Sequence, residues 1–274
     1  MINFHKIIKY CALAFAFFLV FGILSGIMYL MMSLGNAFSK DSNPSDRLEE
    51  LNINGTAKVI NININHSNLI IKTGELFKVM TNNEDIVIRE EENGLFIEEE
   101  NNRWLSFGKN EDNLVIYVPN DLILDEIVID TGTGKIEIDK LSTQKLYLDL
   151  GSGNLVANQL EVLEKSEIDG GVGEIEVKQG LLYNLDLDMG VGNATLNSYL
   201  LGKSDISVGV GSINLNLMGN KDEYNITVDK EIGSVKMEGT EIRSNTHYGN
   251  GSNLIQIDGG IGNIDIDFKG GFYE

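Results

Sequence analysis

Six aspartates recur at matching positions in the second half of the chain, each shortly before the second glycine of a Gly-rich step: Asp130, Asp149, Asp169, Asp188, Asp229 and Asp258. Carboxylate oxygens are preferred ligands of hard cations such as Ca²⁺, so a ladder of stacked aspartates would form a cation-binding row. The alternative is local, because an Asp next to a tight corner accepts hydrogen bonds from turn amides. Ser207 stands in the same slot. Since Ser can accept such a bond but is a poor metal ligand, the pattern favours the turn-shaping role.

The other motifs that could carry chemistry are incomplete. Residues 170–173 and 259–262 resemble calcium β-roll repeats, but Ile175 and Ile264 occupy the position of the Asp ligand. No Gly-x-Gly completes a phosphate-binding loop. Beyond residue 11 there is no Cys, and only His66 and His247 remain as imidazoles, so a nucleophile–base pair and a zinc site both lack parts. The sequence predicts a protein with no catalytic residues and no cofactor.

The aspartates belong to a unit that is repeated seven times between Ile127 and Glu274. Each copy has alternating apolar residues, an Asp or Ser, a Gly-rich step and alternating apolar residues again. The second glycines of the step are separated by 19, 20, 19, 19, 22 and 29 residues, and we interpret them as structural turn residues: Gly134, Gly153, Gly173, Gly192, Gly211, Gly233 and Gly262. A period near 20 with two short strands per unit indicates stacked supersecondary units.

The alternation changes phase at each glycine. In the first copy Ile127 and Ile129 share one parity, whereas Ile136 and Ile138 share the other. A slip of one residue within a strand would turn the apolar set toward solvent. A glycine with positive φ can bend the chain there and keep both sets inward. Each unit is therefore predicted to be a strand, a glycine corner, a second strand and a polar return loop.

Stacking such units would align equivalent residues about 4.8 Å apart. One apolar column would then follow chain order as Ile136, Leu155, Ile175, Ala194, Ile213, Val235 and Ile264. We expect an all-β fold, a repeat β-solenoid of stacked parallel rungs, over residues 127–274. A stack of hairpins is the alternative, because Asp-x-Gly-x-Gly can also close a tight turn.

Residues 51–126 are a degenerate version of the same repeat. Alternating isoleucines precede His66 and Ser67, which stand where the glycines would be. A polar insertion follows with the single tryptophan, Trp104, which is a candidate partner contact or a cap over the core. Atypical terminal repeats commonly cap a stack. At the other end we expect Phe268, Phe272 and Tyr273 to cover the last layer.

The N-terminal region predicts a membrane anchor. Residues 11–34 form an uncharged run of 24 residues, long enough to span a bilayer as an α-helix. Lys6 and Lys9 precede it, so residues 1–10 are expected in the cytoplasm and the chain after the polar linker 35–50 outside the membrane. Cleavage as a signal peptide near residues 35–37 is the rival interpretation.

The net charge of residues 41–274 restricts the classes of partner that the chain can bind. Residues 41–274 carry 18 basic and 41 acidic residues, a formal charge of −23. Nucleic acids and anionic membrane surfaces both require a cationic surface, so no nucleic acid partner is expected.

The spaced glycine series, preceded by LVIYVPNDLILDEIVIDTGTG at residues 114–134, resembles the DUF4097 family, also called the toastrack domain and described as an adhesin domain. The resemblance covers roughly residues 51–274. It implies an all-β, extracytoplasmic, non-enzymatic module behind one N-terminal membrane helix, near the cell-envelope stress-response systems of Gram-positive bacteria. It implies no catalytic residues.

The resulting hypothesis is a membrane-anchored, extracytoplasmic module for interaction or sensing at the bacterial cell envelope. Its expected partners are envelope or membrane proteins and cell-wall polymer. The alternatives are a surface adhesin or glycan-binding module and, in third place, a carbohydrate-active β-helix enzyme.

Overall fold

A computed structural model of the chain describes residues 48–51, 53, 57–91, 94–100 and 111–270. The predicted membrane helix at 11–34, the flanking segments 1–10 and 35–47, and Trp104 lie outside these residues. No helix among the described residues is long and apolar enough to cross a bilayer.

The described residues are almost entirely strand, and all the strands join one sheet, as the alternating pattern predicts. The strands are β1 (Glu49–Leu51), β2 (Val59–Ile64), β3 (Asn68–Gly74), β4 (Lys78–Thr81), β5 (Ile86–Glu91), β6 (Gly94–Glu99), β7 (Asn113–Pro119), β8 (Leu124–Tyr183), β9 (Leu185–Leu201), β10 (Lys203–Leu217), β11 (Tyr224–Met237), β12 (Thr240–Ile242), β13 (Thr246–Tyr248) and β14 (Asn253–Phe268).

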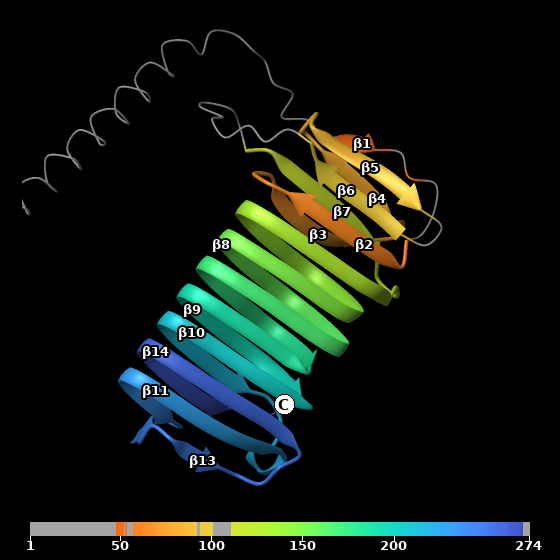
Figure 1. Cartoon of the computed structure of the whole chain (residues 1–274). Helices are drawn as coiled ribbons and strands as arrows, with labels where there is room; N and C mark the ends of the chain where they lie inside the picture. Colours follow the sequence, from red (N-terminus) through yellow and green to blue (C-terminus); the bar gives the residue numbers. More distant parts are fainter. Residues whose placement is uncertain (1–47, 52, 54–56, 92–93, 101–110, 271–274) are drawn as a thin grey trace, which may run out of the picture. The chain divides into compact units, whose positions relative to one another are not determined.

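The seven repeats form parallel rungs, which confirms the solenoid and excludes the hairpin stack. Repeats 1–3 lie within β8, repeat 4 is β9, repeat 5 is β10, repeat 6 is β11 and repeat 7 is β14. Neighbouring rungs pair in parallel, with Gly211 opposite Gly192 and Ile213 opposite Ala194. Figure 1 shows β8, β9, β10, β14 and β11 as successive rungs of one stack.

The change of parity at the glycines keeps both strands of a rung facing the core. In β10, Ile206 and Val208 are buried before the corner, and Ile213 and Leu215 are buried after it. Equivalent residues of adjacent rungs lie directly above one another, so the interior is a set of continuous aliphatic columns. Each fully buried Leu or Ile in such a column contributes about 1.5–3 kcal/mol of hydrophobic stabilisation.

The order of the rungs differs from the order of the repeats. Repeat 7 (β14) pairs in parallel with both β10 and β11, so it lies between repeats 5 and 6. The column expected to end Ile213, Val235, Ile264 therefore runs Ile213, Ile264, Val235. After repeat 6 the chain forms β12 and β13, which pair with β11. It then returns and places repeat 7 between repeats 5 and 6.

The N-terminal end has the mirrored arrangement. β2 and β3 form the rung that pairs in parallel with repeat 1, and β6 and β7 form the rung beyond them. Between these two rungs in sequence come β4 and β5, which pair antiparallel with β7 and β6. At both ends, antiparallel strands thus cover the outermost parallel rung and block addition of strands from other chains.

Phe268 does not cover the last layer, because β14 is an inner rung. Its ring packs against Tyr224 of β11 and Tyr248 of β13, with ring centroids 6.1 and 5.8 Å apart. Phe272 and Tyr273 lie outside the described residues.

Candidate functional site

The glycine corners have no room for a side chain. Gly192 and Gly211 both have φ of +147°, where L-residues are strained. A methyl group added at Gly211 would lie 1.6 Å from the carbonyl oxygen of Gly192, and one at Gly192 would lie 1.7 Å from that of Gly173. The rungs therefore approach so closely at this column that backbone packs on backbone. The first glycine of the step forms a second such column, in which a methyl group at Gly209 would lie 2.7 Å from the carbonyl oxygen of Gly190.

The six aspartates of the repeat are stacked on the surface at the end of the first strand, and all are exposed. Asp229 accepts hydrogen bonds from the backbone N–H of Lys230 (2.8 Å) and the hydroxyl of Ser244 (3.0 Å), the local role weighed above. Within the described part of the chain, no three His, Cys, Asp or Glu side chains converge as a metal site would require. Cation binding by the ladder stays a prediction.

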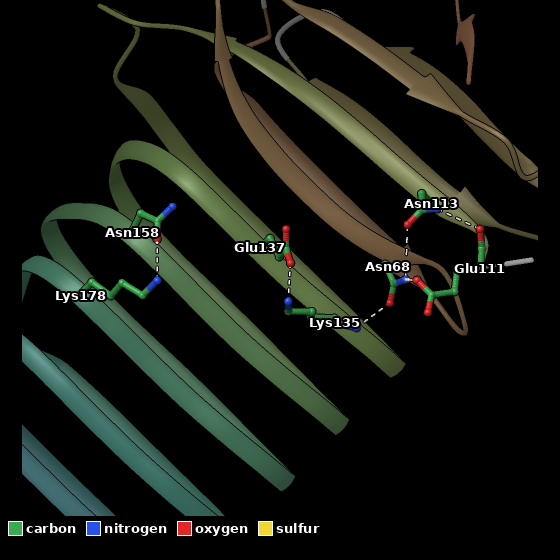
Figure 2. Close-up of polar contacts among 7 residues, drawn as sticks. All are labelled: Asn68, Glu111, Asn113, Lys135, Glu137, Asn158 and Lys178. Carbon is green, nitrogen blue, oxygen red and sulfur yellow. Dashed lines mark hydrogen bonds and ion pairs between the residues drawn. The ribbon is translucent and has the colours of Figure 1, made fainter. Parts of the chain in front are cut away.

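Asparagines just after the corner bind the backbone of the next rung, a role the sequence did not reveal. The Oδ1 atom of Asn193 accepts a hydrogen bond from the N–H of Ser212 (3.1 Å), and that of Asn154 accepts one from the N–H of Glu174 (3.0 Å). Figure 2 shows the first of the series, in which the N–H of Lys135 donates to Asn68 (3.0 Å). Asn263 does the same for Ser234 (3.3 Å). In the spatial order of the rungs, every second rung carries one of these asparagines. The alternation over the last rungs becomes visible only when the order of the rungs is known.

The residue between the two glycines of each corner points outward and forms a column of its own. In five successive rungs this residue is Val or Ile and is about half exposed: Val172 (54%), Val191 (46%), Val210 (45%), Ile261 (49%) and Ile232 (60%). We call these five residues the apolar ridge. Glycines flank Val172, Val191, Val210 and Ile261 on both sides, whereas Ile232 follows Glu231.

One side of the ridge is acidic. In repeats 3 and 4 the first strands present Glu167, Asp169, Asp186 and Asp188 in adjacent registers. Burial raises the pKa of Asp169, and the charges of Glu167, Asp149, Asp188 and Asp186 raise it further. The close placement of these carboxylates therefore concentrates negative potential beside the ridge.

Lysines offset only part of this charge. Lys165 forms an ion pair with Glu167 (2.6 Å) within β8, and Lys203 forms one with Asp205 (2.8 Å) within β10. The hydrogen bond to Glu167 raises the pKa of Lys165, and Asp205 has the same effect on Lys203. Asp169 and Asp188, which lie nearer the ridge, have no ion pair within the described residues.

The other side of the ridge combines neutral polar and acidic side chains. A shallow groove of about 510 Å³ lies there, over the second strands of repeats 3, 4, 5 and 7. Its lining is polar, and no Lys or Arg contributes to it: Glu174, Ile175, Glu176, Asn193, Thr195, Ser212, Asn214, Asn263 and Asp265. The ridge thus separates the stacked carboxylates of the first strands from a groove in which amide and hydroxyl groups are interspersed with the carboxylates of Glu174, Glu176 and Asp265.

The corner of the β2–β3 rung is built without glycine. The buried carboxylate of Glu99 accepts hydrogen bonds from the backbone N–H groups of Asn65 (2.7 Å) and His66 (3.0 Å) and from the Nδ2 of Asn83 (2.9 Å). His66 stands in line with the ridge, with its Nδ1 3.2 Å from the hydroxyl of Thr133. His247, on β13, is exposed.

Comparison with known proteins gives one family. The family described as Toastrack DUF4097 matches residues 48–253. No curated protein matches the chain.

Two solved structures are similar over 81% of this chain and 98% of their own. One is a candidate cell adhesion protein from Clostridium sporogenes, at 17% identity and a TM-score of 0.35. The other is a candidate adhesin from Bacteroides fragilis, at 13% identity and a TM-score of 0.41.

Proposed function

The chain belongs to the toastrack family DUF4097, and we propose that it is a non-catalytic binding module that recruits a partner protein along the apolar ridge. The run at residues 11–34 would anchor it in the bacterial cell membrane, with residues 1–10 in the cytoplasm and the stack outside. There it would contact envelope or membrane proteins and take part in sensing or in an envelope stress response.

The observation that carries this proposal is the unbroken row of five exposed Val and Ile side chains. Soluble proteins scatter single apolar residues over their surfaces, but contiguous apolar patches mark interaction sites. The corner itself does not require an apolar residue there, because Thr133 and Ser152 fill the same position in repeats 1 and 2. The choice of Val or Ile in the next five rungs therefore supports a role in binding.

A photo-crosslinking residue in the full chain, expressed in cells, tests the proposal. At position 191 on the ridge we expect one discrete adduct with a partner protein, whereas position 195, beyond the corner in the same strand β9, should give much less. Changing Val172→Thr and Val210→Thr in the same chain should abolish the adduct. Equal adducts at 191 and 195, or no effect of the two threonines, would refute docking on the ridge.

Glycan binding is a second candidate function, favoured by the polar groove of about 510 Å³ beside the ridge. Its amide and hydroxyl groups could exchange hydrogen bonds with a polyhydroxylated polymer such as a cell-wall glycan. Co-sedimentation of the full chain with purified wall polymer checks this. Binding should be lost in Thr195→Ala/Asn214→Ala and kept in the ridge variant.

A further inference from the structure

We infer that the segment docked on the apolar ridge is a basic amphipathic helix, lying along the stack with its apolar stripe on the ridge and its cationic side chains over the acidic columns. This inference rests on the proposed docking role of the ridge and names the chemistry of the partner. Three observations carry it: the spacing of the ridge residues, the uneven distribution of charge on its two sides, and the bare glycine backbone around it.

The spacing of the ridge residues suits a helix better than an extended strand. Neighbouring ridge residues belong to paired rungs, so they repeat at about 4.8 Å and the five span about 19 Å. A helix lying along the row offers one apolar position per turn of about 5.4 Å, which gives about 22 Å over the same four intervals. A strand offers same-face residues every 6.6 Å or so, or about 26 Å. A helix of about 15 residues therefore stays in step along the ridge, whereas a strand does not.

The charge beside the ridge requires a partner that is basic on one flank. Four aspartates form a row beside the ridge, because each lies three residues before a ridge residue in the sequence: Asp169, Asp188, Asp258 and Asp229. Three residues of chain span at most about 11 Å, which is comparable to the diameter of a helix with its side chains, about 10–12 Å, so a Lys or Arg on the flank of a helix seated on the ridge can approach these carboxylates. Burial first, and then the neighbouring carboxylates, raise the pKa of Asp169, so an approaching cation would favour its charged form.

The second-strand side of the ridge requires a different chemistry on the other flank of the partner helix. In repeats 4, 5 and 7 the first residues beyond the corner are Asn193, Ser212 and Asn263, which carry no charge. The carboxylates that line the groove on this side lie only in repeats 3 and 7 (Glu174, Glu176 and Asp265), so Lys or Arg along that whole flank would lack partners over repeats 4 and 5. The expected partner sequence therefore has apolar residues at i, i+4, i+7 and i+11, with Lys or Arg on one flank and neutral polar residues on the other.

The glycines provide the room for such a helix. Gly171, Gly190 and Gly209 are exposed and carry no side chains, so open backbone lies beside Val172, Val191 and Val210. Bulky apolar side chains of a partner can rest there against the flanks of the ridge. A second copy of this chain would match the spacing of the rungs, but its formal charge of −20 opposes pairing with an equally acidic chain.

Three synthetic 16-residue helical peptides test the inference with the full chain by isothermal titration. The first has a Leu stripe with Lys on one flank, the second has Glu in place of Lys, and the third has the composition of the first with the stripe scrambled. We expect binding of the first only, with at least a tenfold loss for the other two. Its affinity should fall steeply with salt.

Protein variants assign the binding to the ridge. Val191→Thr/Val210→Thr should weaken binding of the first peptide at least tenfold, and Asp169→Asn/Asp188→Asn should weaken it and flatten its salt dependence. The matched control Thr195→Ala/Asn214→Ala should leave it unchanged. Thermal unfolding verifies that each variant is folded, and Val172→Thr/Ile261→Thr replaces the first ridge variant if that one is not.

The results separate this inference from the docking role itself. Equal binding of the Lys and Glu peptides, or unchanged binding by the ridge variants, overturns the inference. So does a dimer of the full chain that the ridge variants dissociate in sedimentation. A crosslinked partner whose contact segment is acidic or extended would also overturn it, yet would leave the ridge as a docking site.

Discussion

The stack turns its corners in two ways. In repeats 1–7 the corner is glycine, and the backbones of adjacent rungs touch with no side chain between them. In the β2–β3 rung, Asn65, His66 and Ser67 take those positions, and the buried carboxylate of Glu99 holds their N–H groups. Both corners turn the chain, but only the glycine corner leaves its outer surface bare.

That difference relates the repeat to the proposed function. The polar groups of the β2–β3 corner form hydrogen bonds within the stack. The residue at the ridge position there, His66, contacts the hydroxyl of Thr133 through its Nδ1 atom. A glycine corner makes no such demand, so the residue between the glycines is free to be chosen for its outward face. The same glycines that allow close stacking thereby create the surface on which the apolar ridge stands.

The largest effect is expected from a side chain in the glycine column. Gly211→Ala would place a methyl group 1.6 Å from a backbone oxygen, at a φ of +147°. Since a backbone contact cannot be relieved by a rotamer change, we expect loss of cooperative folding, measured by thermal unfolding of the full chain. Gly239→Ala is the matched control: its φ is +71° but nothing lies within 4 Å, so it should cost only about 1 kcal/mol. Similar losses in the two variants would contradict the packing explanation.

The polar corner should depend on one carboxylate. Glu99→Ala removes the acceptor for buried N–H groups of Asn65 and His66, and we expect the free energy of unfolding to fall by about 3 kcal/mol in urea titrations. Glu98→Ala, which removes an exposed ion pair with Arg89, should cost less than about 1 kcal/mol. Equal costs would mean that the buried carboxylate does not hold this corner.

A smaller effect is expected at the asparagines that bind the next rung. Asn193→Ala leaves the N–H of Ser212 without its acceptor and should lower the free energy of unfolding by about 1 kcal/mol. Asn158→Ala serves as the comparison, because its side-chain oxygen accepts a hydrogen bond from the exposed ammonium of Lys178 (3.1 Å), as Figure 2 shows. Its cost should stay below about 0.5 kcal/mol. A larger cost for Asn158→Ala than for Asn193→Ala would mean that the asparagines after the corner do not stabilise it.

The smallest effect concerns the charge beside the ridge. The pKa of Asp169 is raised above its usual 3.8, so its ionisation is unfavourable in the folded state. The stability it contributes is present below the unfolded-state pKa and is lost as the pH rises through the folded-state pKa. Asp169→Asn should therefore raise the unfolding midpoint at pH 7 by about 1 °C, with no gain near pH 3. A lower midpoint at pH 7 would contradict the repulsion among these carboxylates.

Much of the fold was predictable from the residues alone. The change of parity at Gly211 requires two strands that both face inward, and the period near 20 requires that the rungs stack. His66 and Ser67 were correctly placed at the corner of a degenerate rung, because the isoleucines before them keep the same alternation.

The spatial order of the last rungs was not predictable in the same way. Local alternation is identical whether β14 follows β11 or inserts before it, and only pairing between distant segments decides. The longer spacings of 22 and 29 residues around Gly233 are the trace of this excursion in the sequence. The apolar ridge was missed for a related reason: Val191 and Val210 continue the alternation of buried residues but point outward at the corner.

The order of residues along the ridge and along the core columns is set by repeat 7 lying between repeats 5 and 6. Cysteine pairs in a Cys11→Ser background test this most directly under mild oxidation. Val210→Cys/Ile261→Cys places two cysteines in paired rungs, about 4.8 Å apart, and should form a disulfide. Val210→Cys/Ile232→Cys places them two rungs apart, about 9.6 Å, and should not. A disulfide in the second pair and none in the first would contradict the order of the rungs.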